Sequence, residues 1–194
     1  MDQREFIAFF DRIEKLKCNT RHSWTSSGRR ESVAEHCWRL AVMVMLCRDE
    51  YPGTDAGRAV RMALVHDLGE AVLGDIPSFE KTEGDFGEED RAVTELFSAL
   101  PDTYRDELSS LYAEFRAGET AEAKLCRALD NLEAVLQHNE APIDTWLPLE
   151  YSLQLEYGGD TAAFSAWTEG LRRELNKDTL AKIDSEGGKK EKTQ

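Results

Sequence analysis

The spacing of apolar residues constrains the fold of this chain more than any other feature of its sequence. Apolar residues recur at intervals of three and four almost throughout, and no stretch alternates with period two for long. Such spacing gives a helix one apolar face, whereas a half-buried strand needs alternation. The sequence therefore predicts an all-α fold of about seven or eight helices. We expect them roughly at 3–17, 32–51, 55–73, 88–100, 102–117, 120–140, 149–157 and 160–175.

The chain is long enough for one domain with a sizeable core, because it has 194 residues and 41% of them are hydrophobic. We expect this single domain over residues 1–183. Ser32 and Glu35 are spaced as a capping box, which predicts the start of a helix. Residues 76–90 are acidic and contain glycine, which is typical of a mobile loop that could cover a site. The polar composition of residues 184–194 predicts a disordered tail.

The formal net charge of −14 at pH 7 creates a field that repels nucleic acid and anionic membranes. We therefore expect neither as a partner, and an anionic substrate has to be attracted locally by a metal ion or a few arginines. The four cysteines are scattered, with no C-x-x-C pair and no signal peptide at the start, which favours reduced thiols in the cytoplasm. The longest apolar run, Leu40 to Cys47, is too short to span a membrane.

One of the four histidines lies in the sequence HDLGEAVLGD, at residues 66–75. On a helix, His66 and Glu70 are four residues apart and Asp67 and Glu70 are three apart, so all three lie on one side. That side would hold one imidazole and two carboxylates. Burying these groups without a compensating charge would be costly.

Two residues on other predicted helices could complete a metal site with this stretch. His36 lies in the first turn of the capped helix, and Asp130 lies within an apolar helical stripe, where an unpaired carboxylate is costly. Two imidazoles and two carboxylates would neutralise a divalent ion and leave about two of six octahedral positions open, which suits Mn, Co, Fe or Ni better than structural zinc. A histidine or aspartate within a helix is more often an ordinary core or surface residue, so the residues alone leave both interpretations open.

Three stretches resemble the HD-domain metal-dependent phosphohydrolases over roughly residues 5–140: ESVAEH, HDLGE followed by GDIP, and ALDNLEAVLQ. Within that family they look like the 5′-deoxynucleotidase branch, which removes phosphate from deoxyribonucleoside 5′-monophosphates. The resemblance implies an HD-domain helical bundle and a phosphoric monoester hydrolase. It implies one divalent transition metal ion, Co, Mn, Fe, Ni or Zn, with Glu70 orienting or deprotonating the attacking water. Its ligands would be His36, His66, Asp67 and Asp130.

The resemblance also suggests Asp75 near the sugar or the leaving oxygen, with Arg21 and Trp24 at the phosphate and deoxyribose. The arginine and the tryptophan are adjacent in bacterial members of the family, whereas they are separated here as Arg21-His22-Ser23-Trp24. A guanidinium can hold two phosphate oxygens, and a tryptophan beside C2′ would disfavour a ribose hydroxyl. Trp24 could equally anchor a loop, and Arg29 and Arg30 are as well placed in sequence for a phosphate contact as Arg21.

The resemblance also implies a homodimer that acts on a small nucleotide. Three functions other than a deoxynucleotidase stay open. An alarmone hydrolase shares the HD core, but its usual signature is HDxxED, and Ala71 follows Glu70 here. A regulatory module that binds metal or nucleotide without catalysis would normally have lost a ligand or the glutamate, and none is missing. A purely helical interaction protein would carry the H-D pair by chance. His22 and His138 are not at motif positions and are left out of the metal site.

Overall fold

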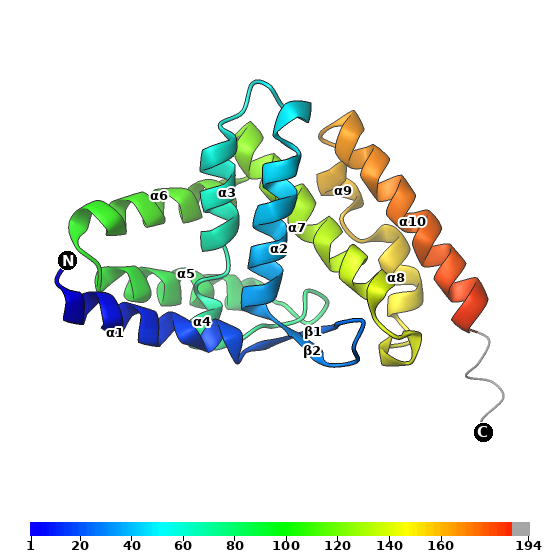
Figure 1. Cartoon of the computed structure of the whole chain (residues 1–194), viewed down its shortest axis with the longest axis horizontal. Coiled ribbons are helices and arrows are strands. Elements are labelled where there is room, and N and C mark those ends of the chain that lie inside the picture. Colours follow the sequence, from blue (N-terminus) through cyan, green and yellow to red (C-terminus); the bar gives the residue numbers. More distant parts are fainter. Residues whose placement is uncertain (188–194) are drawn as a thin grey trace. The chain divides into compact units, whose positions relative to one another are not determined.

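The computed structural model describes residues 1–187, and in this part of the chain it confirms the all-α fold (Figure 1). The longer helices are α1 (Gln3–Ile13), α2 (Val33–Leu46), α3 (Ala56–Val65), α5 (Glu83–Ser98), α6 (Asp102–Ala117), α7 (Ala121–Glu140), α8 (Glu150–Glu156) and α10 (Ala166–Glu186). Two helices of four residues each are α4 (Glu70–Leu73) and α9 (Gly159–Ala162). The remaining elements are the 3-10 helices η1 (Glu14–Lys17), η2 (Arg48–Glu50) and η3 (Ile143–Thr145), and the strands β1 (Thr20–Trp24) and β2 (Arg30–Ser32).

Contacts within the chain divide it into two compact units. The first comprises Met1–His22 and Glu31–Cys126, and the second comprises Ser23–Arg30 and the chain from Arg127 onward. Helix α7 contributes residues to both units. The single domain expected over residues 1–183 stays a prediction. Within residues 1–187, no helix combines the length and the apolar character that crossing a membrane requires.

The core of the first unit is built by packing α2 against α3, α3 against α6, and α6 against α5. Helices α5 and α6 fold back on each other as a hairpin (Figure 1). Buried residues recur at the three- and four-residue intervals from which the helices were predicted. Among them are Val33, Leu40 and Val44 on α2, Ala59, Met62 and Ala63 on α3, and Leu96 and Phe97 on α5.

In the second unit, α8 and α9 pack against α10. Leu132 and Val135 of α7 form a buried cluster with Ala162 and Leu175. Helix α10 continues to Glu186, so residues 184–186, which we expected to be disordered, are helical. The rest of the expected tail, residues 188–194, lies outside the described residues.

Helix α2 begins at the predicted capping box. The Ser32 hydroxyl accepts a hydrogen bond from Glu35 N at 3.3 Å, and the Glu35 carboxylate accepts one from Ser32 N at 2.9 Å. These two bonds satisfy main-chain donors that the helix itself leaves unpaired. The cap therefore fixes the first turn of α2, which carries His36.

The helix predicted over residues 55–73 is interrupted, because α3 ends at Val65 and α4 begins at Glu70. Between them, Leu68 N donates to Val65 O at 3.1 Å and Glu70 N donates to Asp67 O at 3.0 Å. Such 3-10 bonding brings residues three apart onto one side, as in an α-helix but more tightly. Asp67 and Glu70 therefore share a side because of a tight turn, not because of a continuous helix. Apolar intervals of three fit both geometries, which is why the sequence pattern did not separate them.

The loop expected over residues 76–90 is also shorter than predicted, since α5 begins at Glu83. Thr82 and Asp85 form a second capping box, in which Asp85 Oδ2 accepts bonds from Thr82 N at 2.7 Å and from the Thr82 hydroxyl at 2.6 Å. This cap offsets part of the helix stability that the glycines at 84 and 87 cost. Residues 76–82 remain outside helices.

A two-stranded sheet of β1 and β2, which the sequence did not predict, precedes α2. Its turn is closed by Thr25 N, which donates to Arg29 O at 2.8 Å, and Gly28 supplies a positive φ of 81°. Strands of five and three residues are too short for alternation to be recognised in the sequence. Strand β1 carries Arg21 and Trp24.

Candidate metal centre and active site

Three of the predicted metal ligands come together in the first unit. His36 lies in the first turn of α2, His66 directly follows α3, and Asp67 lies in the turn before α4. Asp67 Oδ2 is 3.1 Å from His66 Nε2 and 3.8 Å from His36 Nε2. One ligand atom from each residue lies within 4.8 Å of the others. The two imidazoles are 0% and 6% exposed and the Asp67 side chain is 17% exposed, so this cluster is largely buried.

The orientation of His66 suits a metal ligand. Its Nδ1 atom lies 2.9 Å from the carbonyl oxygen of Ala63. A carbonyl can only accept, so Nδ1 carries the proton and a neutral ring presents its Nε2 lone pair to the cluster. Two imidazole nitrogens and a carboxylate oxygen form a donor set that fits a divalent transition metal ion. The Phe115 ring, with its centroid 5.0 Å from that of His66, packs against the imidazole.

Glu70 is the first residue of α4 and is only 6% exposed. Burial, followed by the negative charges of Asp67 and Asp75, raises the pKa of Glu70 to about 10. Among the described residues its Oε2 atom has no hydrogen-bond partner. A cation placed beside these acids would offset their charge and favour the ionised form of Glu70.

Asp75 follows α4 and belongs to the same cluster of acids. Burial raises the pKa of Asp75, and the positive charge of Arg21 together with a hydrogen bond from His22 N lowers it in part. Arg21 lies between two carboxylates, with Nε 3.5 Å from Glu31 and Nη1 3.8 Å from Asp67. These contacts hold a largely buried guanidinium beside the proposed ligands.

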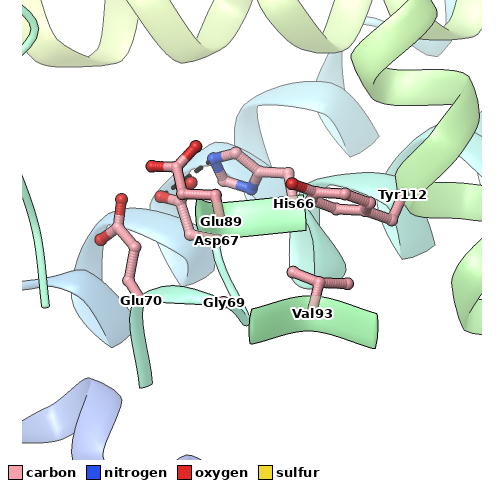
Figure 2. A pocket seen from close by; sticks show the side chains of 7 residues that line it. All are labelled: His66, Asp67, Gly69, Glu70, Glu89, Val93 and Tyr112. Carbon is pink, nitrogen blue, oxygen red and sulfur yellow. Dashed lines mark ion pairs between the residues drawn. The ribbon is translucent and has the colours of Figure 1, made fainter. Parts of the chain in front are cut away.

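A small pocket opens beside these residues (Figure 2). Its volume of about 20 Å³ is enough for one water molecule. Figure 2 shows the close contact of His66 and Asp67 on its wall, with Glu70 nearby and Glu89 contributed by α5. The lining residues are His66, Asp67, Gly69, Glu70, Glu89, Val93 and Tyr112.

Trp24 and Asp130 belong to the second unit. The Trp24 ring faces the Arg30 guanidinium, 4.8 Å from the ring centroid, and its carbonyl accepts a hydrogen bond from Gln137 at 2.7 Å. Asp130 is half-buried on α7. The roles of Trp24 in the sugar site and of Asp130 as a ligand stay predictions.

Sequence reasoning missed several residues that touch this site. The Cys37 thiol hydrogen-bonds with His66, and burial raises the pKa of Cys37. The Asn19 side chain donates to the main-chain oxygen of Glu70 at 2.5 Å. Glu89 and Tyr112 line the pocket from α5 and α6. The helix expected over 88–100 does carry Glu89, and the second capping box could have revealed that it begins at Glu83. No local signal marks Asn19 or Tyr112.

Comparison with known proteins agrees with this arrangement. A family model described as HD domain matches residues 13–171, and the chain therefore belongs to the HD domain family. Human 5′-deoxynucleotidase HDDC2 is 36% identical over 141 residues, which are 71% of this chain and 68% of that protein. The 5′-deoxynucleotidase hdd1 of Schizosaccharomyces pombe is 30% identical over 68% of this chain and 69% of its own length.

A solved structure supports the same assignment over nearly the whole chain. A predicted metal-dependent phosphohydrolase from Magnetospirillum magnetotacticum is 31% identical, with a TM-score of 0.77. The match covers 92% of this chain and 95% of the other. The family resemblance inferred from the motifs is thus confirmed.

Proposed function

We propose that this chain is a metal-dependent phosphomonoesterase that hydrolyses deoxyribonucleoside 5′-monophosphates to deoxynucleoside and phosphate. The observation that carries the proposal is the buried cluster of His36, His66 and Asp67 beside a pocket lined by Glu70. Its relatives in human and fission yeast are named 5′-deoxynucleotidases, which supports this substrate class.

We infer that His36, His66, Asp67 and Asp130 hold one divalent ion, Co, Mn, Fe, Ni or Zn. When bound, such an ion acts as a Lewis acid for the phosphoryl group and makes water more acidic. The donor set of the three residues in the first unit supports the inference, since imidazole and carboxylate both suit these metals.

Glu70 is the proposed general base. A divalent cation beside the acids would lower the pKa of Glu70 and favour its ionised form, which can accept the proton of the attacking water. Its buried carboxyl at the pocket wall suits that role. Asp75 is the proposed proton donor to the departing 5′ oxygen. The raised pKa of Asp75, caused by burial, favours a carboxyl that still holds a proton to give.

Arg21 is proposed to contact the phosphate, because it is the guanidinium already held beside Asp67. Trp24 is proposed to contact the deoxyribose and to disfavour a 2′-hydroxyl. Trp24→Ala should raise activity on ribonucleotides relative to deoxyribonucleotides. An unchanged ratio would remove the steric argument and leave Trp24 as an anchor of the β1–β2 turn.

The deciding experiment measures phosphate release from a panel of deoxyribo- and ribonucleoside monophosphates, and phosphate or pyrophosphate release from an alarmone, with Mn, Co, Mg or EDTA. We expect metal-dependent release from the deoxyribonucleoside monophosphates. Release from the alarmone alone would favour the alarmone hydrolase, and release from none of them with metal bound would favour a regulatory module. We further propose that the protein is a cytoplasmic homodimer and that it binds no nucleic acid. Light scattering would test the dimer, and titration with nucleic acid would test the lack of binding.

A further inference from the structure

A largely buried ion pair lies next to the candidate active site and takes no part in the chemistry described so far. Lys81 Nζ pairs with Glu89 Oε1. The two side chains are only 20% and 13% exposed. Lys81 is at the end of segment 74–82, which connects α4 to α5 and carries Asp75, while Glu89 lies on α5 itself. The pair therefore ties this segment to the helix that follows it.

Lys81 has two further neighbours that fix its position. Its ammonium lies over the Phe86 ring, 5.2 Å from the centroid. Burial raises the pKa of Asp75, and the positive charge of Lys81 counters part of that rise, so Lys81 lies close enough to act on this carboxyl. The ammonium thus contacts Glu89 and an aromatic ring, and its charge also acts on Asp75.

Glu89 has a well-defined position, because it lies on a helix that packs against the site residues. It lines the pocket together with His66, Asp67 and Glu70. Helix α5 packs against the turn that carries these residues so closely that a Cβ on Gly69 would lie 2.8 Å from Val93 Cγ2 and 3.5 Å from the Glu89 carbonyl. A side chain at residue 69 would have to displace Val93, so α5 and the turn are closely packed.

We propose that Lys81 is a positioning residue, which acts through Glu89 to hold segment 74–82 against α5 and so presents Asp75 to the substrate. The role of Asp75 rests on the proposed function, whereas the holding of the segment does not. The pair is shielded from solvent, so removing either partner leaves the other charge uncompensated. Fixing a reacting group in this way matters because small displacements in an active site have large effects on rate.

The first test measures how firmly the segment is held, without substrate or metal. Three of its amides are bonded: Gly74 N to Glu70 O, Glu80 N to Pro77 O, and Thr82 N to Asp85. We expect Lys81→Met and Glu89→Gln each to speed hydrogen exchange of these bonded amides about tenfold, because local opening becomes easier. Lys81→Arg should restore protection, since it keeps the charge.

Two matched controls use exposed ion pairs of the same chain. Glu88 neighbours Glu89 on α5 and pairs at 3.7 Å with Arg91, with both side chains more than half exposed. Lys177 pairs with Glu174 on α10, where both side chains are 68% exposed. Glu88→Gln and Lys177→Met should leave exchange in 74–82 unchanged. Unchanged exchange in Lys81→Met as well would overturn the proposal.

The second test is a double-mutant cycle on phosphate release from a deoxyribonucleoside monophosphate. If Lys81 acts through Glu89, kcat should fall about tenfold in each single variant and by the same factor in the double variant. The change in KM should be smaller. If Lys81 instead binds the phosphate, its loss raises KM and adds to the loss in Glu89→Gln, and the proposal is wrong. A wild-type protein that releases no phosphate from any nucleotide contradicts the proposed function, and the exchange experiment still decides on the holding of the segment.

Discussion

Two buried histidines, one in each unit, have nearly the same local geometry and very different surroundings. His66 Nε2 lies 3.1 Å from the Asp67 carboxylate, and His138 Nε2 lies 3.0 Å from that of Glu150. In both rings Nδ1 faces a main-chain carbonyl of the preceding turn, at 2.9 Å and 3.0 Å respectively. Judged by these contacts alone, either pair could be structural or could bind a ligand.

The difference lies in what surrounds each pair. The Glu150 carboxylate also accepts a hydrogen bond from Leu147 N at 2.6 Å, and the His138 carbonyl accepts one from the Trp146 indole at 3.1 Å. These hydrogen bonds from within the protein give polar groups of the pair partners other than a ligand. In residues 1–187, no group of three or more potential metal ligands includes His138.

Around His66 and Asp67, by contrast, further donors and further negative charge converge. His36 joins them within 4.8 Å, and Glu70 contributes another buried carboxyl. A histidine–carboxylate pair is thus a candidate site when a third donor and excess acid gather around it. The His138–Glu150 pair, whose neighbouring hydrogen bonds are made with main-chain groups and an indole, is instead a structural link between α7 and α8.

The largest effect is expected from Glu70→Gln, which keeps the shape of the residue and removes the proposed base. We expect kcat to fall about 10²–10⁴-fold, the usual contribution of a general base, while metal still binds. Glu150→Gln is the matched control, because it alters the carboxyl of the other pair and should leave kcat of the folded protein unchanged. Full activity of Glu70→Gln would show that the base assignment is wrong.

The second largest effect is expected on metal binding, which should depend on the histidines of the first unit and not on His138. His36→Ala should abolish the rise in thermal stability that Co or Mn causes in the wild type, a gain of about 3 kcal/mol at a hundredfold excess over Kd. Thermal unfolding with metal and with EDTA measures it. His138→Ala should keep the full metal-induced rise. Asp130→Ala tests the fourth proposed ligand in the same way, and a preserved rise there would remove Asp130 from the site.

The second pair should matter for stability alone. Glu150→Gln breaks a buried pair and should lower the free energy of unfolding by about 3 kcal/mol, because it leaves His138 with a weaker partner. Urea denaturation with and without metal measures this loss. Equal losses under both conditions are expected, and a loss that metal reverses would mean that the pair is linked to the metal site after all.

Much of the difference between the His66 and His138 pairs could be predicted from the sequence. The intervals of three and four gave the helices, and the Ser32 cap placed His36 in a first turn. His36 lies within 4.8 Å of His66 and Asp67 although it is far from them in sequence, because α2 and α3 pack side by side. What separated His66 from His138 was the motif around each, not the residue type.

Other features were beyond local patterns. The tight turn at residues 66–69 shares its interval of three with a helix, so periodicity could not reveal it. Two glycines and a run of acids hid the start of α5, although Thr82 and Asp85 had the spacing of a cap. The Lys81–Glu89 pair depends on how segment 74–82 folds back onto α5, and no short-range rule predicts that path.

A third pair, Arg58–Glu114, extends the comparison to a partly exposed site and should have the smallest effect. The hydrogen bond from Arg58 Nε, at 2.6 Å, lowers the pKa of Glu114 from its usual value of 4.5, with help from the Thr120 hydroxyl. A carboxyl whose folded-state pKa is depressed stabilises the protein above its unfolded pKa and loses this contribution as the pH falls through the folded one. At pH 7, Glu114→Gln should therefore cost about 1 kcal/mol in the free energy of unfolding, as expected for a pair of this exposure.

The pH dependence of that cost is the informative part. Urea denaturation of both proteins should show the difference at pH 7, a smaller one below pH 4.5 and almost none once the wild-type carboxyl is protonated. Taking the difference between the two proteins cancels the titration of all other acids. A cost that does not change with pH would mean that Glu114 stabilises α6 by packing and not by its charge. Added metal should not alter the result, because Glu114 pairs with an arginine and, in residues 1–187, belongs to no group of three potential metal ligands.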